Sequence, residues 1–479
     1  MSGALGPERG VFVNRTLNLR SIKAVGYDLD YTLVHYDAAR WEERAFEHAK
    51  RRLGDEGWPV SALRFDAKTV IRGLAIDLAT GNLVKATRFG YVIRAAHGTR
   101  FLGYDEIRTT YADTLVDLGA DRFVFINVLF SLSEASLYSQ LVEVIDAGDG
   151  PAGVGYAGLY AAVRTALGGA HREGDIRQDI LADLDRFVVR DPDTVLALLD
   201  QRHAGKCLLL ITNSDWSYAD RIMTHAFDPF LPSGTWRDVF DAIVVSADKP
   251  SFFTSDNALF KVIDEEHSLL SPHFGTIDQQ SVFYGGCARR VETSLGLSGD
   301  EILYVGDHLF GDVHFSKALL SWRTLLILRE LETEVSSAIE FKPTQRRLVE
   351  LMSRKQQLEA EIGRLTLAQQ RANKGYVTGV VAPETASLQA ARSAISELDD
   401  EIAPLAVAAG AIRNEAWGPL MRAGIDKSLF ARQVERYADA YASRVSNLLA
   451  PGPHAMLRAQ RVDLPHDAAI AAGPGRAPD

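Results

Sequence analysis

Two carboxylates on alternate positions after an apolar run are the most informative residues of this chain. The run Val25-Gly26-Tyr27 leads into Asp28, and Asp30 and Thr32 follow at alternate positions. Successive strand side chains point to opposite faces, so Asp28 and Asp30 share one face. At the carboxyl end of a parallel strand, that face opens on the crevice where ligands bind. Adjacent carboxylates repel each other unless a cation or proton intervenes, so the pair suits a nucleophile beside a general acid, with a hard divalent cation.

The two carboxylates predict different roles in phosphoryl transfer. A free Asp has a pKa of ~3.9, so Asp28 is ionised at neutral pH and can attack phosphorus. Asp30 would protonate the leaving oxygen and later activate water. Holding that proton at neutral pH requires a pKa raised by about 3 units, which burial and a neighbouring carboxylate favour. The alternative is a polar strand end that binds nothing.

Two further polar motifs follow apolar runs. Thr212, Asn213 and Ser214 come directly after the run 207–211, and Lys249 follows the run 242–245. Hydroxyl and backbone N–H groups at a strand-to-helix turn can hold phosphate oxygens, although Thr, Asn and Ser are also ordinary helix N-caps. A lysine at such a place can neutralise the phosphate and the attacking carboxylate, although most lysines are merely solvated.

A third motif, Gly306-Asp-His-Leu-Phe-Gly-Asp312, follows the apolar run 301–305. Asp307 would complete a Mg²⁺ site with the Asp28 carboxylate and the backbone carbonyl of Asp30, because oxygen ligands suit this ion. Asp312 would act indirectly, by positioning Lys249 or a metal-bound water. The alternative is a helix cap with acidic residues in its first turn.

These motifs need a scaffold of parallel strands. The runs 22–27, 207–211, 242–245 and 301–305 read as buried strands followed by helical patterns, which predicts a doubly wound parallel α/β sheet. A long stretch, about 60–200, separates the first two strands and predicts an inserted domain. Leucines and isoleucines at near-heptad spacing after residue 335, interrupted by Gly375, Gly379 and Pro383, predict an antiparallel helical hairpin.

Composition limits the classes of function. The chain has 479 residues, 47% of them hydrophobic, a net charge of −11 and a pI near 5.6, which disfavours nucleic-acid binding. Only two cysteines, Cys207 and Cys287, are present, so a reducing compartment is expected. No apolar run reaches membrane-spanning length, and the first 20 residues lack a signal-peptide centre. We therefore expect a cytoplasmic protein with no membrane partner.

The order of these motifs resembles that of the haloacid-dehalogenase-like (HAD) phosphohydrolases. Longer segments, including SIKAVGYDLDYTLVHYD, LLLITNSDWSYADRIM and ILYVGDHLFGDV, are similar to the cytosolic purine 5'-nucleotidase family of the IMP/GMP-preferring type, from about residue 11 to 450. The resemblance implies Mg²⁺-dependent hydrolysis of a purine nucleoside 5'-monophosphate through an aspartyl-phosphate, with phosphotransfer in some members. It also implies a homo-oligomer, a dimer or tetramer. The implied roles are nucleophile for Asp28, acid/base for Asp30, phosphate binding for Thr212, Asn213, Ser214 and Lys249, and metal binding for Asp307 and Asp312.

The resemblance further implies a base-binding set. Phe130 and His171 fall where family members sandwich the purine, and Arg164 matches an arginine that reads the purine edge. Gly168 replaces an aspartate of that edge-reading pair, and Arg177 stands where a lysine is expected. Losing a side chain that pairs with the base should weaken discrimination between bases.

The expected fold is therefore α/β, a HAD-like Rossmannoid core (a doubly wound parallel sheet) with an inserted cap domain and a C-terminal helical hairpin. The predicted boundaries are 1–98 for the first part of the core, 99–192 for the cap, 193–335 for the second part of the core, 336–412 for the hairpin, and 413–479 for a segment that returns to the core and ends in a loose tail.

Two alternatives to a purine nucleotidase stay open. One is a HAD phosphatase that acts on a different phosphorylated metabolite, and Gly168 is the residue that favours this alternative. The other is a non-catalytic scaffold that uses the helical hairpin to bind a partner. The GxGxxG pattern at 153–158 does not follow a strand tightly, so we expect a loop there and not a dinucleotide site.

Overall fold

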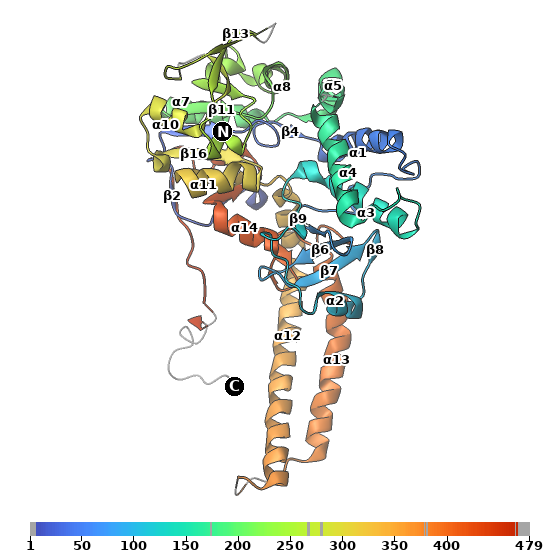
Figure 1. Ribbon diagram of the computed structural model, residues 1–479. Coiled ribbons are helices and arrows are strands. Elements are labelled where there is room, and N and C mark those ends of the chain that lie inside the picture. Colours follow the sequence, from blue (N-terminus) through green and yellow to red (C-terminus); the bar gives the residue numbers. More distant parts are fainter. Residues whose placement is uncertain are drawn as a thin grey trace. The chain divides into compact units, whose positions relative to one another are not determined.

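The computed structural model describes residues 6–172, 175–265, 269–277, 281–377, 379, 382–464 and 466–467. Contacts divide the chain into two compact units (Figure 1). Unit 1 comprises Met1–Arg44, Ala170–Arg329 and Gln433–Asp479, and unit 2 comprises Ala45–Gly169 and Glu330–Arg432. Residues 468–479 of the predicted tail lie outside the described residues.

Unit 1 is built on a ten-stranded sheet in the described part of the chain, in the order β1-β20-β17-β16-β3-β11-β12-β15-β13-β14. The strands from β20 to β15 are mutually parallel, whereas β1, β13 and β14 are antiparallel to their neighbours. Their bounds are β1 Val11–Val13, β3 Ala24–Tyr27, β11 Cys207–Ile211, β12 Ala242–Val245, β13 Leu259–Asp264, β14 Leu269–Pro272, β15 Val282–Gly285, β16 Ile302–Gly306, β17 Arg323–Ile327 and β20 Ala440–Ala442.

The five central strands explain where the site forms. In chain order they lie third-second-first-fourth-fifth, as β12, β11, β3, β16 and β17. Chain order reverses direction at β3, and in open α/β sheets such switch points hold the ligand-binding crevice at the carboxyl ends of the strands. All four residues of β3 are buried, as expected for a strand covered on both faces. The predicted α/β class with a doubly wound sheet is confirmed.

Helices follow the strands of unit 1. They are α5 Asp175–Ala182, α6 Leu184–Phe187, α7 Pro192–His203, α8 Trp216–Phe227, α9 Ser251–Thr254, α10 Ala288–Leu295 and α11 Phe315–Leu320. Two more, α1 Ala38–Asp55 and α14 Leu429–Tyr437, run across the division between the units. A hairpin-like excursion after β3 contains β4 His35–Tyr36, which pairs with β10 Val188–Val189.

Unit 2 has its own antiparallel sheet in the order β8-β7-β6-β5-β9. The strands are β5 Ala75–Asp77, β6 Asn82–Ala86, β7 Val92–His97, β8 Arg100–Phe101 and β9 Phe123–Phe125. Helices α2 Tyr104–Tyr111 and α3 Leu132–Asp146 accompany it, as does α4 Tyr156–Arg172 up to Gly169. Small and aromatic residues such as Ala75, Val84, Ala95 and Phe123 form its core.

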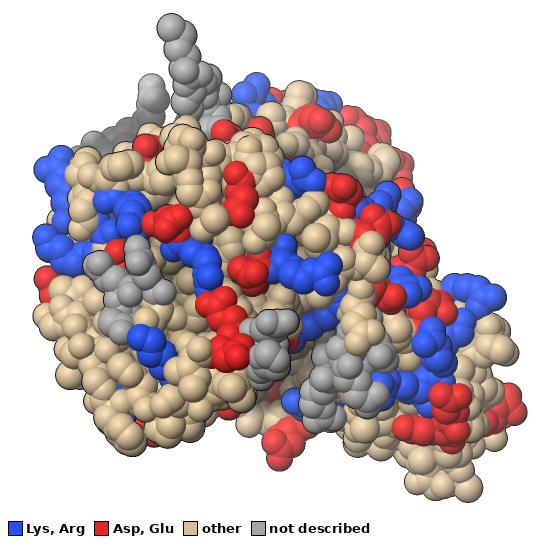
Figure 2. All heavy atoms as spheres, turned by 90° about the horizontal axis from the view of Figure 1, so that it is seen from above, with Lys and Arg blue, Asp and Glu red and all other residues tan. Residues whose placement is uncertain are grey.

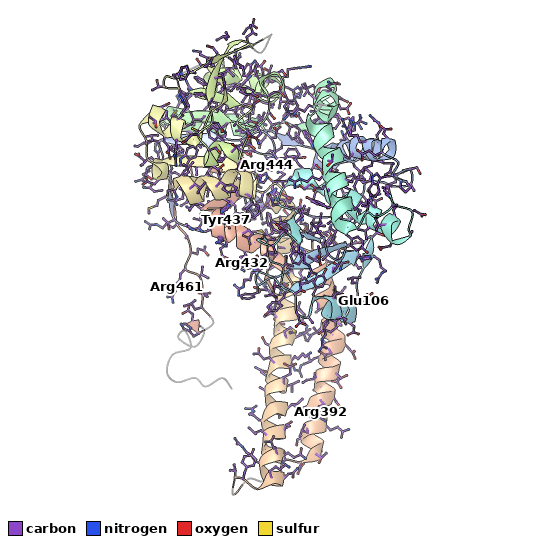
Figure 3. All side chains as sticks on the ribbon, in the orientation of Figure 1. Glu106, Arg392, Arg432, Tyr437, Arg444 and Arg461 are labelled. Carbon is purple, nitrogen blue, oxygen red and sulfur yellow. The ribbon has the colours of Figure 1, made fainter. Side chains whose placement is uncertain are left out.

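Two long helices of unit 2, α12 Leu331–Lys374 and α13 Thr385–Gly410, run side by side (Figure 1). They occupy the region predicted as a helical hairpin. Leu351, Leu398 and Ile402 form a small buried cluster between them, with Leu348 packed against it. Both helices expose charged side chains, of which Arg392 projects from α13 (Figure 3), together with apolar ones such as Val349 and Val407.

The two units divide the chain at residues other than the predicted boundaries. Residues 45–98, predicted as core, belong to unit 2, and residues 170–192, predicted as cap, belong to unit 1. Strand pairing accounts for residues 75–97: β5 pairs with β6 and β9, β6 pairs with β7, and none of these three strands joins the parallel sheet. Among the described helices, none has the length and apolar character to cross a membrane. Acidic and basic side chains are interspersed on the face seen in Figure 2.

Candidate active site

Asp28 lies at the carboxyl end of β3. Its backbone N–H donates to the Val305 carbonyl at 2.9 Å, so the ladder between β3 and β16 extends to this residue. The residue is only 9% exposed. Burial raises the pKa of Asp28 to about 6, the Asp312 charge adds to that effect, and the Lys249 ammonium opposes it.

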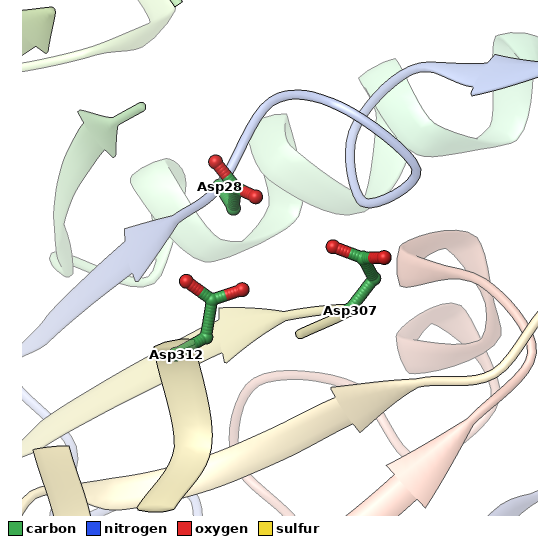
Figure 4. A group of neighbouring side chains, drawn as sticks. All are labelled: Asp28, Asp307 and Asp312. Carbon is green, nitrogen blue, oxygen red and sulfur yellow. The ribbon is translucent and has the colours of Figure 1, made fainter. Parts of the chain in front are cut away.

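Three carboxylates converge at this strand end (Figure 4). Asp28, Asp307 and Asp312 each offer an oxygen, and these oxygens all lie within 4.8 Å of one another. Asp307 follows β16, and Asp312 sits in the helical turn Leu309–His314, where it accepts the His308 N–H at 3.1 Å. A Cβ at Gly306 would lie 2.4 Å from an Asp312 oxygen, so only glycine leaves room for this carboxylate. The structure thus brings together the acidic residues that the sequence predicted.

Lys249 is the buried counter-charge of the cluster. Its ammonium lies 2.8 Å from both the Asp28 and the Asp312 carboxylates and donates to the Tyr304 hydroxyl at 2.9 Å. Burial alone would lower the pKa of Lys249, but the two carboxylates together raise that pKa well above its usual value. The Tyr304 ring packs on β3 where a Cβ at Gly26 would come within 2.9 Å, so this glycine makes room for the ring that carries the hydroxyl.

The loop after β11 is tied to the lysine loop. The Thr212 N–H continues the ladder to the Val244 carbonyl, and the Thr212 hydroxyl accepts the Ser214 N–H at 3.0 Å. The Asn213 side chain accepts the Lys249 N–H at 2.6 Å and donates to the Lys249 carbonyl at 3.0 Å. Asn213 therefore holds the two loops together and fixes the backbone that carries the lysine.

Asp30 lies two residues beyond the candidate nucleophile. Its carboxylate accepts hydrogen bonds from the Ser214 hydroxyl at 2.6 Å and from the Tyr36 hydroxyl at 2.5 Å. Burial, followed by the Asp28 charge, raises the pKa of Asp30, whereas the two hydroxyl donors lower it. A carboxyl whose pKa is raised is suited to hold and release a proton near neutral pH.

Arg177, predicted from the resemblance to contact the base, lies in α5 of unit 1. Its guanidinium donates to Asp215 at 2.6 Å and to the Ser214 hydroxyl at 3.3 Å. The structure thus places Arg177 beside a residue predicted to bind phosphate, at the same end of the sheet as the acidic cluster.

Of the other base-binding candidates, Phe130 and Arg164 belong to unit 2, whereas residue 171 falls in unit 1. Phe130 is half-buried in the short turn Leu129–Ser131, and Arg164 is exposed on α4. Burial raises the pKa of Glu134, and the Arg164 charge opposes that rise. Gly168 and His171 also lie in α4, and the side chain of His171 is outside the described residues. Their roles in base binding stay predictions.

Sequence reasoning missed two tyrosines of the site. Tyr304 interrupts the aliphatic strand β16 and contacts Lys249, and Tyr36 follows the DLDYT motif and contacts Asp30. A buried tyrosine usually finds a partner for its hydroxyl, so a tyrosine inside an aliphatic strand was the available signal for Tyr304.

The site joins a buried carboxylate, a lysine that contacts two carboxylates, a second carboxyl with a raised pKa, and an acidic cluster whose oxygens suit a divalent cation. With the doubly wound sheet, these are the features that the resemblance to HAD-like phosphohydrolases predicts.

The chain belongs to the 5' nucleotidase family, whose sequence profile matches residues 11–469. It is 27% identical over 467 residues to a 5'-nucleotidase domain-containing protein of Dictyostelium discoideum, covering 95% of this chain and 74% of the relative. It is also 27% identical over 481 residues to the human 5'-nucleotidase domain-containing protein 2, covering 96% of this chain and 85% of the relative.

Solved structures resemble the chain more remotely. An archaeal β-phosphoglucomutase from Pyrococcus matches 64% of this chain and 87% of its own, with 11% identity and a TM-score of 0.31. A phosphoglycolate phosphatase from Haemophilus somnus, named as predicted, matches 64% of this chain and 85% of its own, with 13% identity and a TM-score of 0.28.

Proposed function

We propose that this protein is a Mg²⁺-dependent 5'-nucleotidase that hydrolyses purine nucleoside 5'-monophosphates of the IMP/GMP type through an aspartyl-phosphate. The observation that carries the proposal is the convergence of the Asp28, Asp307 and Asp312 carboxylates within 4.8 Å. Lys249 lies in direct contact with two of them. A structural ion pair needs only one carboxylate for each lysine, whereas a phosphoryl-transfer site needs this excess of acid to hold a cation.

The donor set fits a magnesium ion. All three side chains offer hard carboxylate oxygens, and Asp307 and Asp312 are almost fully buried, at 3% and 1% exposure. Asp28 and Asp307, with the backbone carbonyl of Asp30, would hold the ion, and Asp312 would act indirectly through Lys249. When bound, Mg²⁺ neutralises phosphate charge and balances the excess of carboxylates.

The residues of the chain then divide the reaction into two displacements. In the first, an Asp28 oxygen bonds to phosphorus, the bond from phosphorus to the 5'-oxygen breaks, and Asp30 gives its proton to that oxygen, so a neutral nucleoside leaves. Lys249 and the Thr212–Ser214 loop hold the phosphate oxygens during this step.

In the second displacement, Asp30 takes a proton from water while the water oxygen attacks phosphorus. The bond between phosphorus and the Asp28 oxygen breaks, which releases inorganic phosphate and restores both carboxyl groups to their starting states. Phosphotransfer follows the same path when the 5'-hydroxyl of a second nucleoside replaces water.

The test is a panel of phosphomonoesters assayed for released phosphate with and without Mg²⁺. We expect hydrolysis of IMP and GMP above that of pyrimidine nucleotides and sugar phosphates, and its loss on chelation. Asp28→Asn should abolish turnover without unfolding the protein. Equal activity of the mutant and wild type would reject the enzymatic assignment, and a preference for a non-nucleotide ester would reject the substrate class.

Two further properties belong to this proposal. We expect the protein to be cytoplasmic and to form a homo-oligomer, a dimer or tetramer, as the resemblance implies. Light scattering on the purified full chain tests the second expectation, and a monomeric mass would contradict it. The base-binding roles of Phe130, Arg164, His171 and Arg177 are tested by exchanging each for alanine and comparing KM among nucleotides.

A further inference from the structure

The Asp30 carboxylate is held by hydroxyl groups on both of its oxygens. The Tyr36 hydroxyl donates to Oδ1 at 2.5 Å, and the Ser214 hydroxyl donates to Oδ2 at 2.6 Å. These donors come from different elements, because Tyr36 lies in β4 and Ser214 follows β11. The proposed mechanism assigns no role to Tyr36.

We propose that Tyr36, supported by Tyr218, is a positioning residue that orients the Asp30 carboxyl toward the leaving oxygen. The inference rests on the proposed function, because it assigns Tyr36 a role in the same phosphoryl-transfer reaction.

The local fold returns Tyr36 to the residue that it contacts. After Asp30 the chain reverses in a tight turn, in which the N–H groups of Leu33 and Val34 both donate to the Leu29 carbonyl at 3.0 Å. Tyr31 adopts a left-handed φ of 54° in this turn, and Asp30 and Val34 form a bridge. The strand that follows, β4, then brings the Tyr36 side chain back toward Asp30.

Packing prevents the Tyr36 ring from turning away. The side chain is 4% exposed, and its ring centroid lies 4.6 Å from that of Trp41 and 5.3 Å from that of Tyr31. The packed ring therefore holds the Tyr36 hydroxyl within hydrogen-bond distance of Asp30.

Tyr218 completes the arrangement. Its hydroxyl lies 3.1 Å from that of Tyr36, and because Tyr36 donates its single proton to Asp30, it accepts the proton of Tyr218. The Arg177 guanidinium sits 5.1 Å above the Tyr218 ring and also donates to Ser214. Two chains of donors therefore end on the two oxygens of Asp30, and each donor strengthens the next by polarisation.

The physical role follows from the freedom of a carboxyl group. The terminal torsion of an aspartate is broad and roughly two-fold, so packing at Cβ does not fix the plane of its oxygens. Two donors on different oxygens fix that plane, and each oxygen keeps a further lone-pair position that can carry the proton for the leaving group. A displacement of about 1 Å at such a group costs on the order of 10²-fold in rate.

Tyr36 could either stabilise the fold alone or orient Asp30 for proton transfer. Substrates with different leaving groups distinguish these two roles. A nucleoside 5'-oxygen needs a proton to depart, whereas p-nitrophenolate departs without one. The value of kcat/KM reports the steps up to the formation of the phosphoenzyme. A misdirected Asp30 should therefore lower kcat/KM for the nucleotide far more than for p-nitrophenyl phosphate.

The experiment compares Tyr36→Phe with a matched control, Tyr27→Phe. Tyr27 is also a fully buried tyrosine, and it donates to Gln201 at 2.8 Å without contacting Asp30. For Tyr36→Phe we expect kcat/KM for IMP to fall by about 10²-fold, with the value for p-nitrophenyl phosphate within about three-fold of wild type. Tyr27→Phe should leave the ratio of the two values unchanged.

Two further variants separate a specific effect on Asp30 from a general loss of folded protein. Tyr218→Phe should show the same selectivity with a smaller loss, and Asp30→Asn the same selectivity with a larger one. An equal loss on both esters in Tyr36→Phe and Tyr218→Phe, or the same selectivity in Tyr27→Phe, would overturn the inference.

A crystal structure of Tyr36→Phe keeps this inference separable from the proposed function. We expect the Asp30 carboxyl plane to be rotated or disordered relative to wild type, and an unchanged plane would overturn the inference whatever the activity. If the wild-type protein hydrolyses neither ester, the proposed function fails. The orientation of the Asp30 carboxyl in the Tyr36→Phe crystal structure still decides whether Tyr36 positions that carboxyl.

Discussion

Neutralising Asp307 should make the metal-free protein more stable while removing its response to magnesium. Asp307→Asn keeps the shape of the side chain and removes one negative charge from the cluster with Asp28 and Asp312. Lys249 contacts the latter two carboxylates, so these two acids share one ammonium and Asp307 adds a third negative charge beside them. Without a cation, this excess of negative charge opposes folding.

The magnitude follows from the geometry. Two unit charges 4.8 Å apart repel by about 3 kcal/mol at an effective dielectric constant near 20, and by about 1 kcal/mol at the value of water. Asp307 is 3% exposed, so salt screens it weakly. We therefore expect Asp307→Asn to raise the free energy of unfolding in EDTA by about 1–3 kcal/mol, which raises Tm by roughly 2–10 °C for a unit of this size.

Magnesium should reverse the order of stability. A ligand present at about 100 times its Kd stabilises a folded protein by about 2.7 kcal/mol, and wild type should gain on this scale. Asp307→Asn should gain little. The assay is thermal and urea unfolding of both proteins in EDTA and in a Mg²⁺ series, with Asp463→Asn, an exposed acid of the same charge, as control. A variant that unfolds more easily than wild type in EDTA, or that keeps the full Mg²⁺ shift, would refute this reasoning.

Three further perturbations have defined outcomes. The pKa of Asp28 is raised to about 6 when folded, so folding takes up a proton and its contribution to stability falls as pH rises toward 7. In EDTA, Asp28→Asn should therefore gain about 1 kcal/mol relative to wild type between pH 5 and pH 7 in urea titrations, and a flat difference would contradict the sign. Lys249→Met leaves buried carboxylates uncompensated and should cost about 3–5 kcal/mol in metal-free unfolding, with kcat reduced by roughly 10²–10³; wild-type stability would show that the lysine does not compensate them. Leu351→Ala removes a side chain that is 3% exposed from the hairpin cluster and should cost about 2–5 kcal/mol, seen as faster amide exchange in α12 and α13, with kcat unchanged; a lower kcat would mean that the hairpin supports the site.

The parallel sheet could be predicted because its buried strands are recognisable in the sequence as short apolar runs. The predicted run 242–245 coincides with β12 and the run 207–211 with β11, since each is apolar throughout and ends at a polar loop. The run 22–27 begins two residues before β3, because burial alone does not mark where pairing starts. Polar residues at the carboxyl ends of such strands meet at one edge, and this is why the separate motifs predicted a single acidic cluster.

The division into units and the hydroxyl contacts could not be predicted in the same way. Whether β5–β7 extend the parallel sheet or form their own depends on pairing between distant strands, and local apolar patterns do not encode partners. The contact of Tyr36 with Asp30 depends on a chain reversal that begins at a left-handed Tyr31, a conformation uncommon outside glycine. When a chain reversal brings a side chain back to a motif a few residues earlier, no regular residue spacing in the sequence predicts the contact.

The same geometry that limits stability prepares the site for its proposed chemistry. Asp28 must stay reactive, so its neighbours cannot neutralise it fully, and Lys249 divides its charge between Asp28 and Asp312. The Tyr304 hydroxyl, which accepts from Lys249 and donates to the Ile211 carbonyl at 2.9 Å, holds the ammonium in place without adding a further charge. A second cation built into the chain would stabilise the empty site but would occupy the position that the acidic cluster offers to a metal. The acidic cluster therefore carries more negative charge than Lys249 can balance. A site that binds a divalent ion together with a phosphate needs this imbalance.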